Sequence, residues 1–457
     1  MRIHFIAIGG SVMHHLAIAL KEEGHQVSGS DDVIFDPAES NLKEADLFPD
    51  QLGWDANRIS NELDLVILGM HAKNDNPELA KAQELGLKVY SYPEFIYEHS
   101  KNKQRIVIGG SHGKTSVTAM ILHALNQAGR KFDYVIGALP QDFESTIRLS
   151  EDAPIIVVEG DEYLTSALDP TPKFLYYQAH IRVITGIAWD HINVFPTFEG
   201  YVEQFKRFAE QAPKAGTLIY NTSDKVLKKL IKQADVRHDV VQIPYEAHKY
   251  KIKDGQTLLS NHRKEQVPIH LIGEHNMLNL NAAKQVCLKI GISEDDFYEA
   301  ISSFTGASMR MELVDANENA KVYRDFAHAP SKLEATINAV KSQFPKRTLV
   351  ACMELHTYSS LNKNFLANYK DTMKKADEAV VFYNPKTVEN KRLEQISDEE
   401  LRLAFNDKKL HVFTDVAKMK SFLLAQNWKN ANLLMMSSGN YANLDIKELS
   451  SQLLNGN

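Results

Sequence analysis

The glycine-rich segment 109–116, GGSHGKTS, is the feature that most constrains how this chain can fold. It directly follows the expected strand 105–108, RIVI, and precedes the helix-forming run 117–125. Glycines let backbone N–H groups turn inward on an anion, and the start of the next helix adds its positive dipole end. A strand, such a loop and a helix in this order are typical of an α/β protein with a phosphate site.

The residue types in this loop predict distinct contacts with a nucleotide. The spacing is the short form G-x-x-G-K-[ST], because Ile108 stands where the longer form GxxxxGK[ST] has its first glycine. Lys114 is expected to reach the outer phosphates of ATP, and the Thr115 hydroxyl to ligate Mg²⁺. A glycine-rich turn with a chance Lys-Thr pair is the alternative. The predicted ATP-binding residues of the loop are Gly110, Ser111, His112, Gly113, Lys114, Thr115 and Ser116.

Strand and helix signals alternate along the rest of the chain, which predicts parallel sheets covered by helices. A length of 457 residues allows about three domains. The polar stretch 100–105 is typical of a linker, and 304–306 indicates a further boundary. We also expect a small antiparallel excursion within 236–267 and a helix over 365–375. The predicted domains are a Rossmann-like domain at 1–100, a P-loop ATPase domain at 101–310 and a second Rossmann-like domain at 311–457.

Composition and charge exclude several classes of protein. The formal net charge is −7, whereas a general nucleic-acid binder carries a basic excess. No apolar run approaches the 18 residues of a membrane span, and the first residues lack the pattern of a signal peptide. The two cysteines, Cys287 and Cys352, are far apart in apolar surroundings. We therefore expect no disulfide framework, no membrane insertion and a cytoplasmic location.

Two polar clusters follow apolar runs inside the expected ATPase domain. The first is VEGDEY at 158–163, and the second is Trp189-Asp190-His191. Carboxylates at the end of a strand suit a Mg²⁺ site beside a phosphate loop. A solvated acidic turn and an ordinary surface histidine are the alternatives for these two clusters.

The loop GGSHGKTS resembles the ATP loop of the Mur ligase family, the ATP-dependent amino-acid and peptide ligases of peptidoglycan synthesis. The resemblance extends over nearly the whole chain and implies a nucleotide-sugar domain, an ATPase domain and a domain that receives the incoming amine. Further segments are similar to family motifs: VEGDEY at 158–163, GEHNMLNLNAA at 273–283, GASMR at 306–310 and RDFAHAP at 324–330.

The resemblance implies a role for several of these residues. Glu159 and His191 would ligate Mg²⁺, although Gly186 and Ala188 replace the Asn and Glu of the family motif around His191. Some members carry a carbamoylated lysine near Lys206, which otherwise reads as an exposed helix lysine. The remaining assignments are Asn276 at the adenine, Arg310 at the γ-phosphate, Asp325 near the nucleotide and His328 near the reacting centre.

The first strand and helix are expected to hold a nucleotide diphosphate. Gly9, Gly10 and Ser11 lie between them, and Asp31 follows at the distance typical of a ribose-binding acid. From these residues alone, NAD and a UDP-sugar both remain possible. The resemblance favours a UDP-sugar and adds His71 to this site.

Two segments of the domain predicted to receive the amine distinguish two branches of the family. His356 and Tyr358 match the alanine-adding members, but Thr357 and Ser360 replace both of their arginines. SSGNY at 437–441 is closer to the members that attach a tripeptide in cell-wall recycling.

The resemblance therefore implies a ligase that joins UDP-N-acetylmuramate to L-Ala-γ-D-Glu-meso-diaminopimelate through an acyl phosphate. L-alanine is the alternative acceptor, and a P-loop ATPase or kinase without ligation is the alternative class. We expect Lys114, His191, His328 and His356 to be catalytic, ATP and Mg²⁺ to be the cofactors, and the protein to be a monomer or weak dimer.

Overall fold

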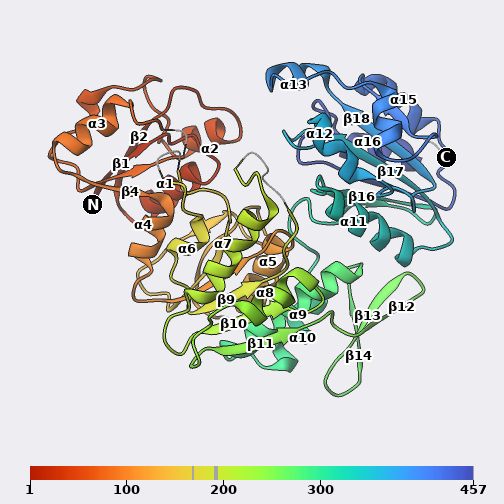
Figure 1. The fold of residues 1–457 in the computed structure, drawn as a ribbon, viewed down its shortest axis with the longest axis horizontal. Helices are drawn as coiled ribbons and strands as arrows, with labels where there is room; N and C mark the ends of the chain where they lie inside the picture. The colour runs from red at the N-terminus through yellow and green to blue at the C-terminus, as the bar shows by residue number, and fades with distance from the viewer. Residues whose placement is uncertain (71, 141, 167–168, 190–193, 456–457) are drawn as a thin grey trace. The chain divides into compact units, whose positions relative to one another are not determined.

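The computed structural model describes residues 1–70, 72–140, 142–166, 169–189 and 194–455. Within these residues the chain forms an α/β protein with four sheets (Figure 1). The described chain divides into two compact units. The first comprises Met1–Trp189, Val194–Glu246 and Ala282–Phe297, and the second comprises Ala247–Asn281 and Tyr298–Asn457. The α/β class is confirmed, whereas the domain boundaries at 100 and 310 stay predictions.

The first sheet has the order β2-β1-β3-β4, and its strands are all parallel. Its core comes from apolar residues of β1 and α1, such as Phe5 and Leu16, and α4 begins with a capping box formed by Ser91 and Glu94. The elements are β1 (Arg2–Ile6), α1 (Met13–Glu22), β2 (Gln26–Ser30), α2 (Ala38–Glu44), β3 (Leu65–Leu68), α3 (Pro77–Glu84), β4 (Lys88–Ser91) and α4 (Tyr92–His99).

The second sheet, also in the first unit, has the order β11-β10-β9-β5-β8-β6-β7. Only β7 runs antiparallel, so the carboxyl ends of β5, β8 and β9 meet at one edge. The strands are β5 (Gln104–Gly109), β6 (Asp133–Val135), β7 (Ile147–Arg148), β8 (Ile155–Glu159), β9 (Ile181–Ile184), β10 (Thr217–Asn221) and β11 (Val241–Tyr245). The helices are α5 (Lys114–Gln127), α6 (Lys173–Tyr176), α7 (Phe198–Glu210) and α8 (Lys225–Gln233). The chain then continues through α9 (Glu274–Lys289) and α10 (Glu294–Ser303).

The second unit holds a narrow antiparallel ribbon and a six-stranded sheet. The ribbon is β12 (Tyr250–Lys253), β13 (Gln256–Ser260) and β14 (Gln266–Ile269) (Figure 1). It lies in the predicted antiparallel excursion, whereas β11 of the same segment joins the parallel sheet.

The six-stranded sheet has the order β15-β16-β20-β17-β18-β19, with only β15 antiparallel. Its strands are β15 (Glu312–Ala316), β16 (Ala320–Asp325), β17 (Thr348–Leu355), β18 (Glu378–Tyr383), β19 (His411–Phe413) and β20 (Ala431–Met436). One core contains residues of α11 (Pro330–Gln343), α12 (Lys363–Leu366), α13 (Pro385–Asn390) and α14 (Asp398–Ala404). A separate core contains residues of α15 (Val416–Leu424) and α16 (Ile446–Asn455).

The predicted helix over 365–375 is wrong. The chain forms only α12 and a short 3₁₀ turn, Ala367–Tyr369. Lys370 then adopts an extended conformation, and Asp371 has a φ of 61°, in the left-handed region that a continuing helix cannot use.

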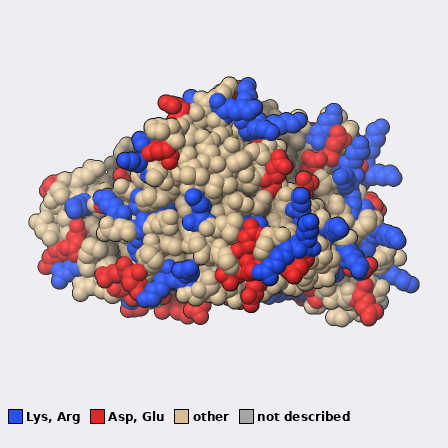
Figure 2. Space-filling view, turned by 90° about the horizontal axis from the view of Figure 1, so that it is seen from below, with Lys and Arg blue, Asp and Glu red and all other residues tan. Residues whose placement is uncertain are grey.

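Charged side chains of both signs lie on the surface. On the face drawn in Figure 2, lysine and arginine side chains are interspersed with aspartate and glutamate. No helix in the described part of the chain is long and apolar enough to cross a membrane. Both cysteines are buried free thiols.

Candidate active site

The glycine loop follows β5 at the edge where the parallel strands of the second sheet end. Gly110 has a φ of 133°, and a Cβ there would lie 2.0 Å from the Oγ1 of Thr185. Gly113 has a φ of 80° and precedes the first residue of α5. The Thr185 hydroxyl also contacts the carbonyl oxygens of Gly109 and His112. Glycine is therefore required at 110 both by the backbone conformation and by the closeness of Thr185.

A chain of buried hydrogen bonds supports the loop from the side of α7. The Tyr201 hydroxyl donates to Glu162 Oε1 at 2.7 Å, and it lies 2.8 Å from Ser111 Oγ. Because the tyrosine proton is directed at the carboxylate, Ser111 is the donor to Tyr201. Ser111 Oγ in turn accepts the Ala188 N–H at 2.9 Å. Ser111 thus contributes to the shape of the loop through its side chain.

Lys114 begins α5 and forms an ion pair with a carboxylate. Its Nζ donates to Glu162 Oε2 at 2.6 Å and to the Gly110 carbonyl at 2.7 Å. Burial by itself lowers the pKa of Lys114, but the nearby charges of Glu162, Asp161 and Glu159 outweigh it and leave that pKa raised. Lys114 is therefore a fixed cation at the mouth of the loop, as a phosphate contact requires. Sequence reasoning treated Glu162 only as part of an acidic cluster and missed this pairing.

Thr115 and Glu159 lie together, which makes them a candidate cation site. Thr115 Oγ1 donates to Glu159 Oε1 at 2.9 Å, and the Gly137 N–H donates to Glu159 Oε2 at 2.8 Å. A hydroxyl and a carboxylate at the end of a strand are hard oxygen ligands that fit Mg²⁺. The neighbouring Asp161 instead pairs with Lys173 at 2.7 Å. Among the described residues no group of three or more His, Cys, Asp or Glu side chains forms a metal cluster.

The other residues predicted for this site either lie outside the described part of the chain or make local contacts. His191, its neighbour Asp190 and His71 lie outside the described residues, so their assignments stay predictions. Lys206 is half-exposed on α7 and lies 3.9 Å from Glu210, one helical turn away. Ser116 lies in the first turn of α5, and the His112 ring contacts the Ser111 carbonyl at 2.6 Å.

The predicted UDP-sugar loop is fixed by Asp31. The Gly9 N–H donates to Asp31 Oδ2 at 2.8 Å, and the Asp32 N–H donates to Oδ1 at 2.9 Å. Burial raises the pKa of Asp31, and the Gly9 N–H partly opposes this rise. A Cβ on Gly9 would lie 2.8 Å from Ile34 and 3.0 Å from Asp31. Gly10 and Ser11 follow before α1 begins. Asp31 thus shapes the loop, a role that sequence reasoning did not give it.

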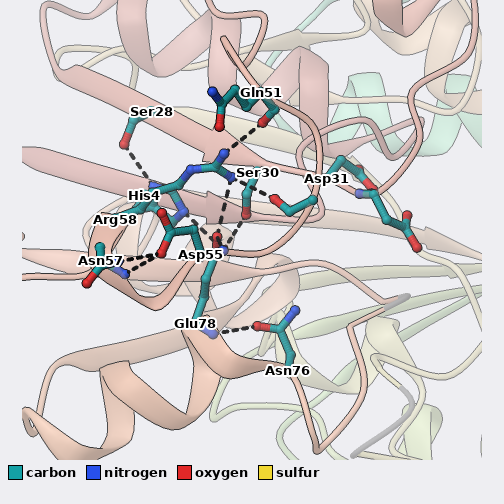
Figure 3. A network of polar contacts seen from close by, with 12 residues as sticks. His4, Ser28, Ser30, Asp31, Gln51, Asp55, Asn57, Arg58, Asn76 and Glu78 are labelled. Carbon is teal, nitrogen blue, oxygen red and sulfur yellow. Dashed lines mark hydrogen bonds and ion pairs between the residues drawn. The ribbon is translucent and has the colours of Figure 1, made fainter.

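The first sheet carries a buried polar network centred on Glu78 (Figure 3). Glu78 accepts hydrogen bonds from Ser30, from His4 at 3.4 Å and from the Asp55 N–H at 2.9 Å. Arg58 lies 3.5 Å from the same carboxylate and donates to the carbonyls of residues 51 and 53 at 2.7 Å. Glu78 therefore links the segment 51–58 to the strands that carry His4 and Ser30.

In the second unit, the predicted adenine contact Asn276 is near the start of α9. Its amide donates to the Ile272 carbonyl at 2.9 Å, and Asn279 approaches its Oδ1 at 3.4 Å. Burial lowers the pKa of His275, although Asp325 and Glu274 oppose this shift. The side-chain N–H of Asn276 thus stabilises the turn at the start of α9.

Asp325, at the end of β16, organises the turn that carries His328. Its carboxylate accepts the N–H groups of Met311 and Ala327 at 2.6 and 2.8 Å. The Arg310 guanidinium lies 4.4 Å from the centroid of the Phe326 ring, which in turn makes an edge contact with His328 at 5.1 Å. The turn therefore brings both Arg310 and His328 into contact with one aromatic ring.

Glu354 is a buried carboxylate at the end of β17 that joins His356 to the loop after β20. It accepts hydrogen bonds from the Ser437 hydroxyl and from the Tyr441 N–H, the latter at 2.9 Å. Its other oxygen lies 3.9 Å from His356 Nδ1. A Cβ on Gly439 would lie 2.7 Å from the His356 ring, so the loop packs directly against this histidine. Sequence reasoning named His356 but gave Glu354 no role.

Three protein-family models match most of the chain. Family models match residues 2–104 (Mur ligase family, catalytic domain), 108–287 (Mur ligase middle domain) and 309–439 (Mur ligase, glutamate ligase domain). The UDP-N-acetylmuramate--L-alanine ligase of Caldicellulosiruptor bescii is 30% identical over 82% of each chain. The UDP-N-acetylmuramate--L-alanyl-gamma-D-glutamyl-meso-2,6-diaminoheptandioate ligase of Escherichia coli K12 is 29% identical over 75% of this chain and 76% of its own length.

The fold also matches a solved structure over its full length. The UDP-N-acetylmuramate-alanine ligase MurC of Thermotoga maritima has a TM-score of 0.72 at 19% identity, covering 100% of this chain and 99% of that chain. Fold and phosphate loop together define an ATP-dependent ligase that forms amide bonds. The chain belongs to the Mur ligase family, which acts in peptidoglycan synthesis.

Proposed function

We propose that this protein joins UDP-N-acetylmuramate to the tripeptide L-Ala-γ-D-Glu-meso-diaminopimelate, with ATP and Mg²⁺, in the cytoplasm. The observation that supports this acceptor is the turn after His356. The Thr357 hydroxyl donates to Ser360 Oγ at 2.9 Å and accepts the Ser360 N–H at 3.1 Å. These two hydroxyls close a turn where the alanine-adding pattern has arginines. A small amino acid would find no guanidinium there to hold its carboxylate.

The proposed reaction begins by activating a poor electrophile. A carboxylate would have to expel oxide, so the γ-phosphoryl group of ATP is first transferred to the lactyl carboxylate. The bond from that phosphorus to the bridging oxygen of ADP breaks, and a new P–O bond gives the acyl phosphate. Lys114 and Arg310 would neutralise the charge on the phosphoryl oxygens. Asn276 would hold the adenine, and Gly9, Gly10, Ser11 and Asp31 the UDP-sugar.

In the second step the amine attacks the acyl carbon, a C–N bond forms, and the C–O bond to phosphate breaks. The amine proton needs an acceptor, and we assign His356 as the base because Glu354 lies next to its ring; His328 is the second candidate. Mg²⁺ would add charge neutralisation at the phosphates, held by Thr115 and Glu159 and, from the sequence resemblance, by His191.

The deciding experiment measures phosphate release with UDP-N-acetylmuramate and ATP in the presence of either the tripeptide or L-alanine. We expect a kcat/KM for the tripeptide about 100-fold higher, since a difference of about 3 kcal/mol in transition-state binding is at stake. The similarity to L-alanine ligases supports L-alanine as the alternative acceptor. Equal or faster turnover with L-alanine than with the tripeptide would favour this alternative. Phosphate release that needs no amine at all would instead indicate an ATPase without ligation.

A further inference from the structure

The second unit contains a cavity of about 290 Å³ next to the loop that packs on His356. It lies where β15 begins, where β16 and β20 end, and where α16 starts. Its lining includes Glu312, Arg324, Ser437, Gly439, Asn440 and Lys447. Ligands of open α/β sheets bind at the carboxyl ends of the strands, which is where this cavity lies.

Arg324 gives the cavity a cation that is only partly used. Its Nη2 donates to Glu312 Oε2 at 2.8 Å. Its Nε is buried and has no hydrogen-bond partner among the described residues, and the same holds for Ser438 Oγ in the loop between two lining residues. The accessible part of Arg324 is therefore not Nε, but 29% of its side chain remains exposed. A guanidinium presents a fork of N–H groups that matches a carboxylate.

The lining carries two cations, Arg324 and Lys447, and two carboxylates, Glu312 and Asp445. Asp445 is occupied by the first turn of α16, where it accepts the N–H groups of Lys447 and Glu448 at 2.9 and 3.0 Å. The exposed ammonium of Lys447 adds a second positive group to the lining. Glu312 is then the one lining carboxylate that competes directly with a ligand for Arg324.

The cavity is also connected to the candidate base. Gly439 belongs to its lining and packs against the ring of His356. A peptide whose amine lies at His356 would extend over Gly439 into the cavity, because each extended residue advances the chain by roughly 3.4 Å.

We propose that this cavity binds the far end of an anionic peptide acceptor and that Arg324 holds a carboxylate of its last residue. The inference rests on the proposed function, since it takes the acceptor to be a peptide. Arg324 is thereby a specificity-determining residue rather than a catalytic one.

The test compares the tripeptide with the same tripeptide amidated at its diaminopimelate carboxyl groups. For the wild type, we expect the amide to have a KM about tenfold higher. Arg324→Gln should raise the KM for the acid to the level of the amide while leaving kcat and the KM of UDP-N-acetylmuramate nearly unchanged. Glu312→Gln should lower the KM for the acid, because it removes the competing carboxylate.

Two further variants control for folding. Arg402→Gln, which removes a comparable arginine paired with Asp398 at 3.7 Å on α14, should leave both KM values unchanged. Arg324→Lys should restore part of the discrimination. If the wild type turns over the tripeptide but Arg324→Gln binds acid and amide as the wild type does, the cavity assignment is overturned while the proposed function stands. A wild type that does not use the tripeptide overturns both.

Discussion

Lys114 is the residue whose removal should affect activity most. Lys114→Ala should lower the rate of phosphate release by about 100-fold or more, because a fixed charge on the transferring phosphoryl group is lost. Binding of UDP-N-acetylmuramate, measured by calorimetry, should be unchanged. The matched control is Lys206→Ala, which removes a half-exposed lysine paired with Glu210. Near-normal turnover of Lys114→Ala would contradict the assignment of the glycine loop as the ATP phosphate site. Loss of activity in Lys206→Ala would instead favour a carbamoylated Lys206.

The cation site makes a separate prediction. Glu159→Gln should raise the Mg²⁺ concentration needed for half-maximal rate by about tenfold, because one of the oxygen ligands loses its charge. Asp161→Asn is the control, since Asp161 pairs with Lys173. The measurement is the initial rate over a Mg²⁺ titration at saturating ATP. An equal response of the two variants would mean that the whole acidic cluster acts only through its charge.

For single residues, the sequence revealed those that belong to local motifs. Lys114 and Thr115 were named because the glycine loop fixes their place in the chain. Glu159 was named because the segment VEGDEY resembles a family motif. Glu162 was missed as the partner of Lys114 because 48 residues separate them. Glu354 was missed because its contacts with Ser437 and Tyr441 span 83 and 87 residues. Such pairings depend on strand order, which no local pattern determines.

Among the elements, the loop between β5 and α5 tolerates the least change. Gly110→Ala should abolish nucleotide turnover, because its Cβ would lie 2.0 Å from Thr185 Oγ1 and its φ of 133° is unfavourable for alanine. Gly129→Ala is the control, since Gly129 also has a positive φ but has nothing within 4 Å of its Cβ position. That variant should lose only about 1 kcal/mol of stability and keep its activity. Full activity of Gly110→Ala would show that the loop can move away from Thr185.

The network around Glu78 predicts a pH-dependent stability. Burial alone raises the pKa of Glu78, but the hydrogen bonds from His4, Ser30 and the Asp55 N–H outweigh it and hold that pKa below its usual 4.5. Stability from this carboxylate is therefore present above its ordinary pKa and is lost as pH falls through the lower folded value. Glu78→Gln should lower the free energy of unfolding by about 2 kcal/mol near neutral pH.

Thermal melts of the wild type and Glu78→Gln measure this effect. The difference in Tm should shrink as the pH is lowered from about 6 to about 3. Glu39→Gln, which removes an exposed partner of Lys43, is the control and should show little change at any pH. A difference in Tm that stays constant with pH would mean that Glu78 acts through packing and not through its charge.

Sequence patterns predicted most elements but not their ends or their pairing. The strands around the glycine loop were predicted because apolar runs there are short and end in glycine. The helix expected over 365–375 was wrong because its apolar spacing continues past Lys370, where the backbone turns. The place of β11 beside β10 also could not be predicted, since the polar stretch around it carries no signal of a parallel strand.

For the whole molecule, the division into two units predicts unfolding that is not two-state. The proposed UDP-sugar residues all belong to the first unit as far as they are described. UDP-N-acetylmuramate at about 100 times its Kd should therefore raise one calorimetric transition by roughly 5 °C and leave the other in place. Gly9→Ala, whose Cβ would meet Ile34, should lose this shift. A single transition that moves as a whole would contradict independent units.

The contact between Lys114 and Glu162 has a consequence for selectivity among cellular anions. A site that already contains its own counter-ion is a weak trap for orthophosphate, which must separate a buried ion pair of 2.6 Å and offers few contacts in return. A nucleotide also binds through its remaining phosphates, its ribose and its base. The free energy of these additional contacts exceeds the cost of separating Lys114 from Glu162. We therefore expect added orthophosphate to inhibit the ligase reaction only weakly.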